Sequence, residues 1–121
     1  MKKRILIVED TEDNRRILCD LLSHAGYELA AALDGEEGVA MAASYRPDLI
    51  LMDVQLPKID GYEATRRIRE DAALRAIPII AVTSYAMSGE EAKALAVGCT
   101  AYVSKPFSPR KILAKIQEIL A

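Results

Sequence analysis

The chain has 121 residues, a length that fits one domain and argues against two. Hydrophobic residues make up 51% of the chain but aromatic residues only 5%, so we expect a core of Val, Ile, Leu and Ala, which suits a buried parallel sheet. The formal net charge is −2 and the Lys and Arg residues are scattered, so the sequence lacks the basic patch typical of proteins that bind nucleic acid directly.

The basic start at residues 2–4 is followed by only four strongly apolar residues, Ile5 to Val8. A secretory signal needs a longer apolar region with a cleavage site, and a membrane span needs about 20 apolar residues. Cys19 and Cys99 lie far apart, without a second Cys or His at metal-ligand spacing, so we interpret them as buried, reduced thiols. These features predict a soluble cytoplasmic protein that does not enter a membrane.

Short aliphatic runs recur along the chain at positions that favour strands. The compact runs at residues 5–8, 49–52 and 78–82 predict strands that are buried on both faces. Residues 27–32 and 100–103 are weaker candidates, which we expect nearer the edges of the sheet.

Segments of helical period lie between these runs and carry start and stop signals. An apolar stripe predicts a helix that ends at Gly26, and capping-box spacing predicts two further helix starts, with Gly98 ending the second of these helices. Ser108 before Pro109 predicts the start of the final helix. The stripe consists of Ile17, Leu18, Leu21 and Leu22, and the capping-box pairs are Asp34 with Glu37 and Ser88 with Glu91.

Strands that alternate with helices in this way pair in parallel through right-handed crossovers. The sequence therefore predicts an α/β fold with an open, doubly wound sheet and helices on both faces. Two strand orders are common for such sheets, and the hydrophobic pattern does not choose between them.

Acidic residues follow two of the predicted strands. Glu9 and Asp10 come directly after the first strand and Asp53 directly after the third. Ligands of open α/β sheets bind beyond the carboxyl ends of the strands, so three carboxylates converge there if these two strands are neighbours. Two like charges about 4 Å apart repel by roughly 4 kcal/mol at an effective dielectric near 20, which a divalent cation would offset. Oxygen-only ligands favour a hard ion such as Mg2+.

Acids at strand ends also serve as turn formers or helix caps, and this alternative stays open for the acidic cluster. We assign that structural role to Asp34, Asp48 and Asp60. His24 follows the first apolar stripe, and we interpret it as a solvated surface residue.

Two further strand ends supply groups that phosphoryl transfer uses. Thr83 and Ser84 end the fourth strand and offer hydroxyl groups, and Lys105 follows the fifth strand. A carboxylate nucleophile, a metal ion, a hydroxyl donor and a lysine position a phosphoryl group and neutralise its charge. Lys105 precedes Pro106, and a cis peptide bond between them would be one way to aim the lysine inward.

Taken together, these motifs resemble the receiver domains of response regulators in bacterial two-component signalling. The resemblance covers essentially the whole chain, so we assign residues 1–121 to one receiver domain, for which the family implies a flavodoxin-like sheet in the order 2-1-3-4-5. The motifs are Ile7-Val8-Glu9-Asp10, Leu51-Met52-Asp53-Val54-Gln55-Leu56-Pro57, Asp60-Gly61, Val82-Thr83 and Ser104-Lys105-Pro106.

The resemblance implies a role for each matching position. Asp53 would accept a phosphoryl group from a phosphohistidine on a histidine kinase or phosphotransfer protein. Mg2+ would be held by Asp53, by Asp10 directly, by Glu9 through water and by the backbone carbonyl of Gln55. The domain would catalyse its own phosphorylation and slow dephosphorylation in this phosphorelay, rather than act as a conventional enzyme.

The same resemblance implies a switch. Lys105 and Thr83 would each contact a phosphoryl oxygen, and Tyr102 would turn inward as Thr83 moves. The 86–107 face, chiefly residues 86–95 and 101–107, would bind the downstream protein target. The domain itself would be a monomer or a weak phosphorylation-dependent dimer.

Two positions are expected to tune the lifetime of the phosphoryl group. Gln55 lies two residues after Asp53, and Tyr85 lies two residues after Thr83. Because Tyr85 is bulky and is neither an acid nor an amide that could position water, we expect a shielded, long-lived phosphoryl group.

Three alternatives remain. The final helix runs to the end of the sequence, which favours a stand-alone receiver of the DivK type, but the pattern also resembles receivers attached to hybrid kinases or excised from a larger transcriptional regulator. The second alternative is an aspartyl-nucleophile phosphatase. Such an enzyme usually has a second Asp two residues after the first, and this alternative is disfavoured because this chain has Gln55 at that position. A pseudo-receiver that only binds protein is disfavoured because the motif residues are intact.

Overall fold

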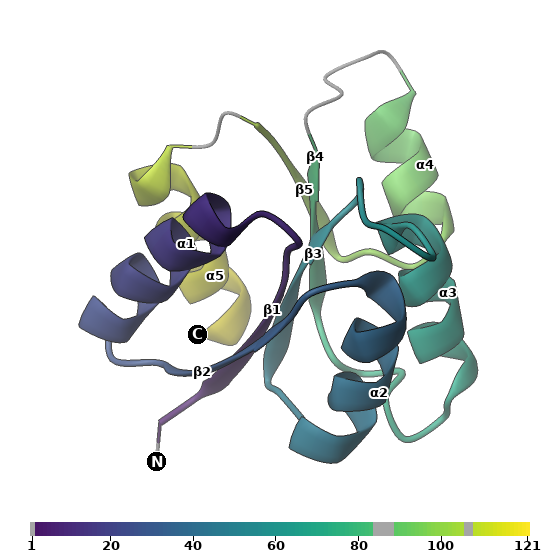
Figure 1. Cartoon of the computed structure of the whole chain (residues 1–121), viewed down its shortest axis with the longest axis horizontal. Helices are drawn as coiled ribbons and strands as arrows, with labels where there is room; N and C mark the ends of the chain where they lie inside the picture. The colour runs from purple at the N-terminus through teal and green to yellow at the C-terminus, as the bar shows by residue number, and fades with distance from the viewer. Residues whose placement is uncertain (1, 84–88, 106–107) are drawn as a thin grey trace.

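The computed structural model describes residues 2–83, 89–105 and 108–121. Within these ranges, strands and helices alternate along the chain (Figure 1). The elements are β1 (Arg4–Val8), α1 (Glu12–His24), β2 (Glu28–Ala32), α2 (Gly35–Tyr45), β3 (Leu49–Asp53), α3 (Gly61–Glu70), β4 (Ile79–Thr83), α4 (Glu90–Ala96), β5 (Ala101–Ser104) and α5 (Pro109–Leu120).

The strands form one parallel sheet in the order β2-β1-β3-β4-β5. This result confirms the doubly wound α/β fold and the 2-1-3-4-5 order. The register pairs Val8 with Met52 and Thr83 with Ser104. The carboxyl ends of β1, β3, β4 and β5 therefore meet at one edge of the sheet.

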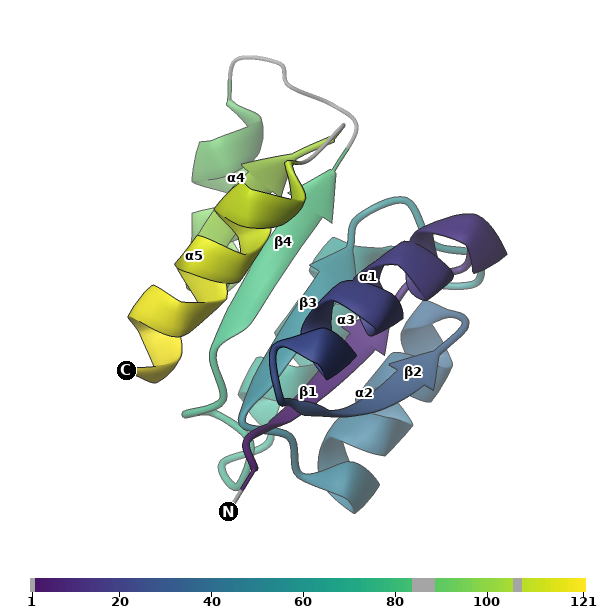
Figure 2. The same cartoon turned by 90° about the vertical axis from the view of Figure 1, so that its left-hand side faces the viewer.

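Helices cover both faces of this sheet. Helices α1 and α5 lie on one face and α2, α3 and α4 on the other, as Figures 1 and 2 show from two directions. Each layer buries its own apolar cluster, because alternate residues of the central strands point to opposite faces. All residues of β3 and β4 are buried, whereas the edge strands β2 and β5 are mostly half-buried, as their sequences predict. Among the described residues, every helix is too short or too polar to cross a bilayer.

Most of the predicted helix boundaries agree with the structure. The Asp34 side chain accepts from the backbone N of Glu37 (2.8 Å), and Asp60 caps α3 in the same way through Glu63 (2.8 Å). Ser108 caps α5, with Pro109 in its first turn. Asp34 and Asp60 are therefore caps, as the sequence predicts.

Two predictions about helices differ from the structure. The predicted helix that ends at Gly98 is present as α4, but its first residue is Glu90 and its N-cap is Gly89, whose φ of 95° turns the chain at that point, rather than Ser88. Ser88 lies outside the described residues. Ile17 is 49% exposed, because the side of α1 that faces the sheet is set by Leu18 and Leu22, four residues apart.

The two cysteines are free thiols. Cys99 is buried and Cys19 half-buried, so only Cys99 matches the prediction of burial in full. Burial raises the pKa of the Cys99 thiol, which keeps it protonated and unreactive.

Candidate functional site

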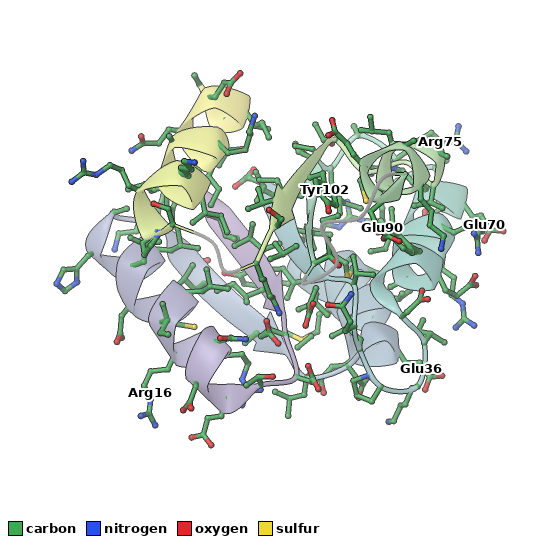
Figure 3. The ribbon with its side chains drawn as sticks, turned by 90° about the horizontal axis from the view of Figure 1, so that it is seen from above. Arg16, Glu36, Glu70, Arg75, Glu90 and Tyr102 are labelled. Carbon is green, nitrogen blue, oxygen red and sulfur yellow. The ribbon has the colours of Figure 1, made fainter. Side chains whose placement is uncertain are left out.

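Three carboxylates meet where β1 and β3 end side by side. Oxygen atoms of Glu9, Asp10 and Asp53 all lie within 4.8 Å of one another. Glu9 is 2% exposed and Asp53 3% exposed, whereas Asp10 is open to solvent. Figure 3 looks down on this end of the sheet, toward which the parallel strands point. The acids that the sequence placed at strand ends are thus brought together by the strand order.

Lys105 reaches the same cluster from the end of β5. Its Nζ lies 3.1 Å from Oε1 of Glu9 and 3.3 Å from Oδ1 of Asp53. Its backbone N donates to the carbonyl oxygen of Thr83 (2.6 Å), which extends the pairing of β4 with β5 by one residue. The predicted convergence of a lysine on the acids is therefore present in the structure.

The three carboxylates of the cluster carry more negative charge than the single Lys105 neutralises. Burial, followed by the hydrogen bond and the charge of Glu9, raises the pKa of Asp53 to about 7, although Lys105 acts in the other direction. Burial also acts to raise the pKa of Glu9, but its hydrogen bonds with Asp53 and Thr11 and the charge of Lys105 together lower it. Burial acts to lower the pKa of Lys105, and the two carboxylates outweigh this and raise it. Near neutral pH the buried carboxyl pair therefore retains a proton for part of the time.

The donor set fits a hard divalent cation. It consists of carboxylate oxygens, two buried and one exposed, so a cation could bind the cluster while keeping water on its open side. The excess of negative charge, visible in the raised pKa of Asp53, gives such a cation a favourable interaction. The site is compatible with Mg2+.

Gln55 makes a contact that the sequence did not predict. Its backbone N donates to Oδ1 of Asp53 (3.3 Å), and its side-chain Nε2 donates to Oγ1 of Thr83 (2.8 Å). Thr83 is fully buried at the end of β4. The sequence indicated a role for the Gln55 carbonyl and for its position two residues after Asp53. The signal that could have indicated a partner for its side chain is that Thr83 ends β4, the strand next to β3.

Two other residues shape the site without having been predicted to do so. Arg15 donates from Nη1 to the carbonyl oxygens of Glu9 (3.1 Å) and Asp10 (3.0 Å), and this holds the turn between β1 and α1. A Cβ on Gly61 would lie 2.2 Å from the carbonyl oxygen of Asp53, so α3 begins directly against the backbone of that residue. Of these two contacts, only that of Gly61 had a signal in the sequence. A glycine beside the helix cap Asp60 indicates that the backbone at this point lies close to another segment of the chain.

Helix α4 is joined to α3 near the site. The hydroxyl of Tyr62 donates to Oε2 of Glu90 (2.5 Å), and Nζ of Lys93 lies 5.4 Å from the centre of the Tyr62 ring. These three side chains, with Gln55 and Asp60, line part of a cavity of about 230 Å³ between the loop after β3 and α4. Tyr102 of β5 lies on the same side of the sheet as Glu90 (Figure 3), half-buried against the apolar cluster beneath α4.

Some of the predicted site residues lie outside the described residues. These are Ser84, Tyr85 and Pro106, so the tuning position at Tyr85 and the Lys105–Pro106 peptide bond remain predictions. The same holds for residues 86–88 and 106–107 of the expected 86–107 face.

Comparison with known proteins gives consistent matches. A family model described as the response regulator receiver domain matches residues 5–117. The chain is 44% identical to the polar-differentiation response regulator DivK of Brucella anthropi over 120 residues, covering 99% of this chain and 98% of the relative. The chemotaxis response regulator CheY4 of Vibrio cholerae superposes with a TM-score of 0.93 at 31% identity, covering 98% of this chain and 99% of that one. A receiver domain of a sensor histidine kinase from Pseudomonas aeruginosa, solved with a magnesium ion coordinated in its active site cleft, has a TM-score of 0.91 at 37% identity over 100% of both chains.

Proposed function

Because this chain belongs to the response regulator receiver family of two-component signalling, we propose that it is phosphorylated on Asp53 in a Mg2+-dependent reaction. A receiver domain implies a histidine kinase or phosphotransfer partner and a downstream effector. The observation that carries the proposal is the position of Asp53, a buried carboxylate within reach of two other acids and 3.3 Å from Lys105. The family model matches residues 5–117, and we propose that the receiver domain comprises residues 1–121.

In the proposed reaction, a carboxylate oxygen of Asp53 attacks the phosphorus of a phosphohistidine. An O–P bond forms, the N–P bond to the imidazole breaks, and the imidazole leaves with the electron pair and takes up a proton. Asp53 must be deprotonated to attack, and the charge of Lys105 favours that form. Lys105, which pairs with the carboxylates of Glu9 and Asp53 before the reaction, can then pair with a negatively charged phosphoryl oxygen.

We propose that Asp10, Asp53 and the Gln55 carbonyl bind Mg2+ directly, with Glu9 contributing through water. The bound ion would supply positive charge that neutralises the acids and the phosphoryl oxygens. Arg15 and Gly61 contribute by holding the two loops that present these ligands.

The consequence of phosphorylation would be a population shift at the surface. Thr83 would hydrogen-bond a phosphoryl oxygen and Tyr102 would turn inward, which favours a surface that is a minor state without phosphate. We propose that the 86–107 face binds the effector protein, and that the domain is a monomer or a weak phosphorylation-dependent dimer. A cytoplasmic location is consistent with its two free thiols.

Intact mass after incubation with acetyl phosphate tests the proposal. We expect one added phosphoryl group in the wild type with Mg2+, and none in EDTA or in Asp53→Asn. Asp48→Asn is the matched control, because this acid accepts from the backbone of Arg4 at the opposite end of β3 and should leave phosphorylation intact.

The absence of an adduct with acetyl phosphate would call for a phosphorylated histidine kinase or phosphotransfer protein as donor. If that donor also failed, a pseudo-receiver that binds a partner constitutively would replace the proposal. An adduct that persists in Asp53→Asn would show that another residue is the acceptor.

A further inference from the structure

The side chain of Gln55 joins the loop after β3 to the end of β4. Its Nε2 donates to Oγ1 of Thr83 at 2.8 Å, while its backbone N donates to Oδ1 of Asp53 at 3.3 Å. Thr83 and Asp53 are both buried. One residue therefore contacts the proposed phosphoryl acceptor and the hydroxyl that is proposed to bind the phosphoryl group.

The loop that carries Gln55 is held at several points. The carbonyl oxygen of Val54 accepts from the backbone N of Gly61 (2.9 Å), which ties the loop to the start of α3. Lys58 Nζ lies 3.4 Å from Oδ2 of Asp34, which joins the loop to α2. The Gln55 amide thus reaches Thr83 from a restrained backbone rather than from a freely moving segment.

The direction of this hydrogen bond matters for Thr83. A hydroxyl group has one hydrogen to donate and two lone pairs that accept. When a lone pair faces the Gln55 amide, the hydroxyl hydrogen must point in another direction. The contact with Gln55 therefore limits the directions in which the O–H bond of Thr83 can point.

The contact should also strengthen when Asp53 carries a phosphoryl group. A hydroxyl that donates to an anionic oxygen becomes a better acceptor, because hydrogen bonds in a chain polarise one another. A hydrogen bond that is stronger in the phosphorylated form favours that form, whereas one of equal strength in both forms would have no effect.

We propose that Gln55 is a positioning residue that orients the Thr83 hydroxyl toward the phosphoryl group on Asp53. The proposal rests on the function proposed above and adds a role for the Gln55 side chain to that of its carbonyl. The Gln55 side chain acts through Thr83, whereas the backbone N of the same residue contacts Asp53.

A double-mutant cycle tests this role. Gln55→Met keeps the length of the side chain but removes the donor, and Thr83→Ala removes the hydroxyl. Two quantities would be measured at saturating Mg2+: the phosphorylation rate with acetyl phosphate, and the affinity for beryllium fluoride, a tetrahedral mimic of the phosphoryl group, by calorimetry. Mg2+ affinity would be measured separately, because a shifted Gln55 backbone would lower it in either background.

We expect Gln55→Met to weaken beryllium fluoride binding by about 3- to 10-fold, the size of a net hydrogen bond. In the Thr83→Ala background the same substitution should have an effect below about 2-fold, because the hydroxyl that Gln55 is proposed to orient is already gone. Since Gln55 lies in a half-exposed loop, the variant is expected to fold, and its thermal melt checks this.

The outcomes separate this inference from the proposed function. Equal losses in both backgrounds, or no loss in the wild-type background, would overturn the positioning role while leaving the receiver chemistry intact. A wild-type protein that binds no beryllium fluoride with Mg2+, and takes no phosphoryl group, would overturn the proposed function and this inference with it.

Discussion

Removing the charge of Asp53 should stabilise the protein in the absence of a divalent cation. Burial and Glu9 raise the pKa of Asp53 to about 7 from 3.8, so the native state binds this proton more tightly than the unfolded state does. A group with a raised native pKa contributes stability that is present below pH about 4 and is lost as pH rises to about 7. Asn resembles the protonated carboxyl and does not titrate, so Asp53→Asn should retain that stability at high pH.

The magnitude follows from the shift. About 3 pKa units at 1.36 kcal/mol each give an upper bound of about 4 kcal/mol in the free energy of unfolding at pH 8. The pKa of about 7 already includes the charge of Lys105, which keeps Glu9 as a partner in Asp53→Asn. Because an amide only approximates the protonated carboxyl, we expect about 1–3 kcal/mol of this bound to be realised. In a domain of this size this corresponds to a melting temperature higher by about 3–10 °C.

Thermal and urea unfolding in EDTA at pH 5, 6, 7 and 8 would measure this difference. The gap between Asp53→Asn and the wild type should widen with pH and narrow when Mg2+ is added, because the ion binds the wild-type acids more tightly. Asp20→Asn, on an exposed position of α1, is the matched control and should melt like the wild type at every pH. A lower melting temperature for Asp53→Asn at pH 8 in EDTA, or a gap that does not change with pH, would refute the model of repelling buried acids.

Three further predictions concern the surroundings of Asp53. Gly61→Ala should lower the free energy of unfolding by about 1–3 kcal/mol in urea titrations and weaken Mg2+ binding, because its Cβ would lie 2.2 Å from the carbonyl oxygen of Asp53; unchanged values would contradict this contact. Tyr62→Phe keeps the ring beneath Lys93 but loses the hydrogen bond to Glu90, so amide hydrogen exchange in α4 should become about 3- to 10-fold faster while α2 is unaffected. Tyr85→Glu could position water and should shorten the phosphoryl lifetime in mass time courses, and equal lifetimes would reject the shielding hypothesis.

The central part of the fold was predictable because two-sided burial leaves a strong mark on the sequence. The runs at residues 5–8, 49–52 and 78–82 are apolar without alternation, and the corresponding strands are buried on both faces. Helix α4 was less predictable. It has seven residues with Ala94 as its buried one, so its sequence carries little periodic signal, and Gly89 rather than Ser88 precedes it.

The acids of the site were predictable for a topological reason, and its finer contacts were not. Parallel strands bring their carboxyl ends to one edge, so the acids directly after β1 and the acid at the end of β3 had to lie close together once these strands were neighbours. The bond from Gln55 to Thr83 depends instead on how a loop is folded and on which rotamer its side chain adopts. Ile17 shows the same limit, since its exposure depends on a small rotation of α1 about its axis.

The cluster around Asp53 destabilises the deprotonated carboxylate, which is the form of this side chain that must react. Near pH 7 a carboxyl group with a pKa of about 7 is protonated about half of the time and is then a poor nucleophile. Lys105 offsets only part of the cost, because it shares its charge between Glu9 and Asp53. A second positive charge at the cluster would lower the pKa of Asp53, remove the repulsion and make the carboxylate available. The same burial that makes the metal-free site unfavourable therefore makes the proposed nucleophile depend on a cation, which connects the stability of the fold to the Mg2+ dependence of the reaction.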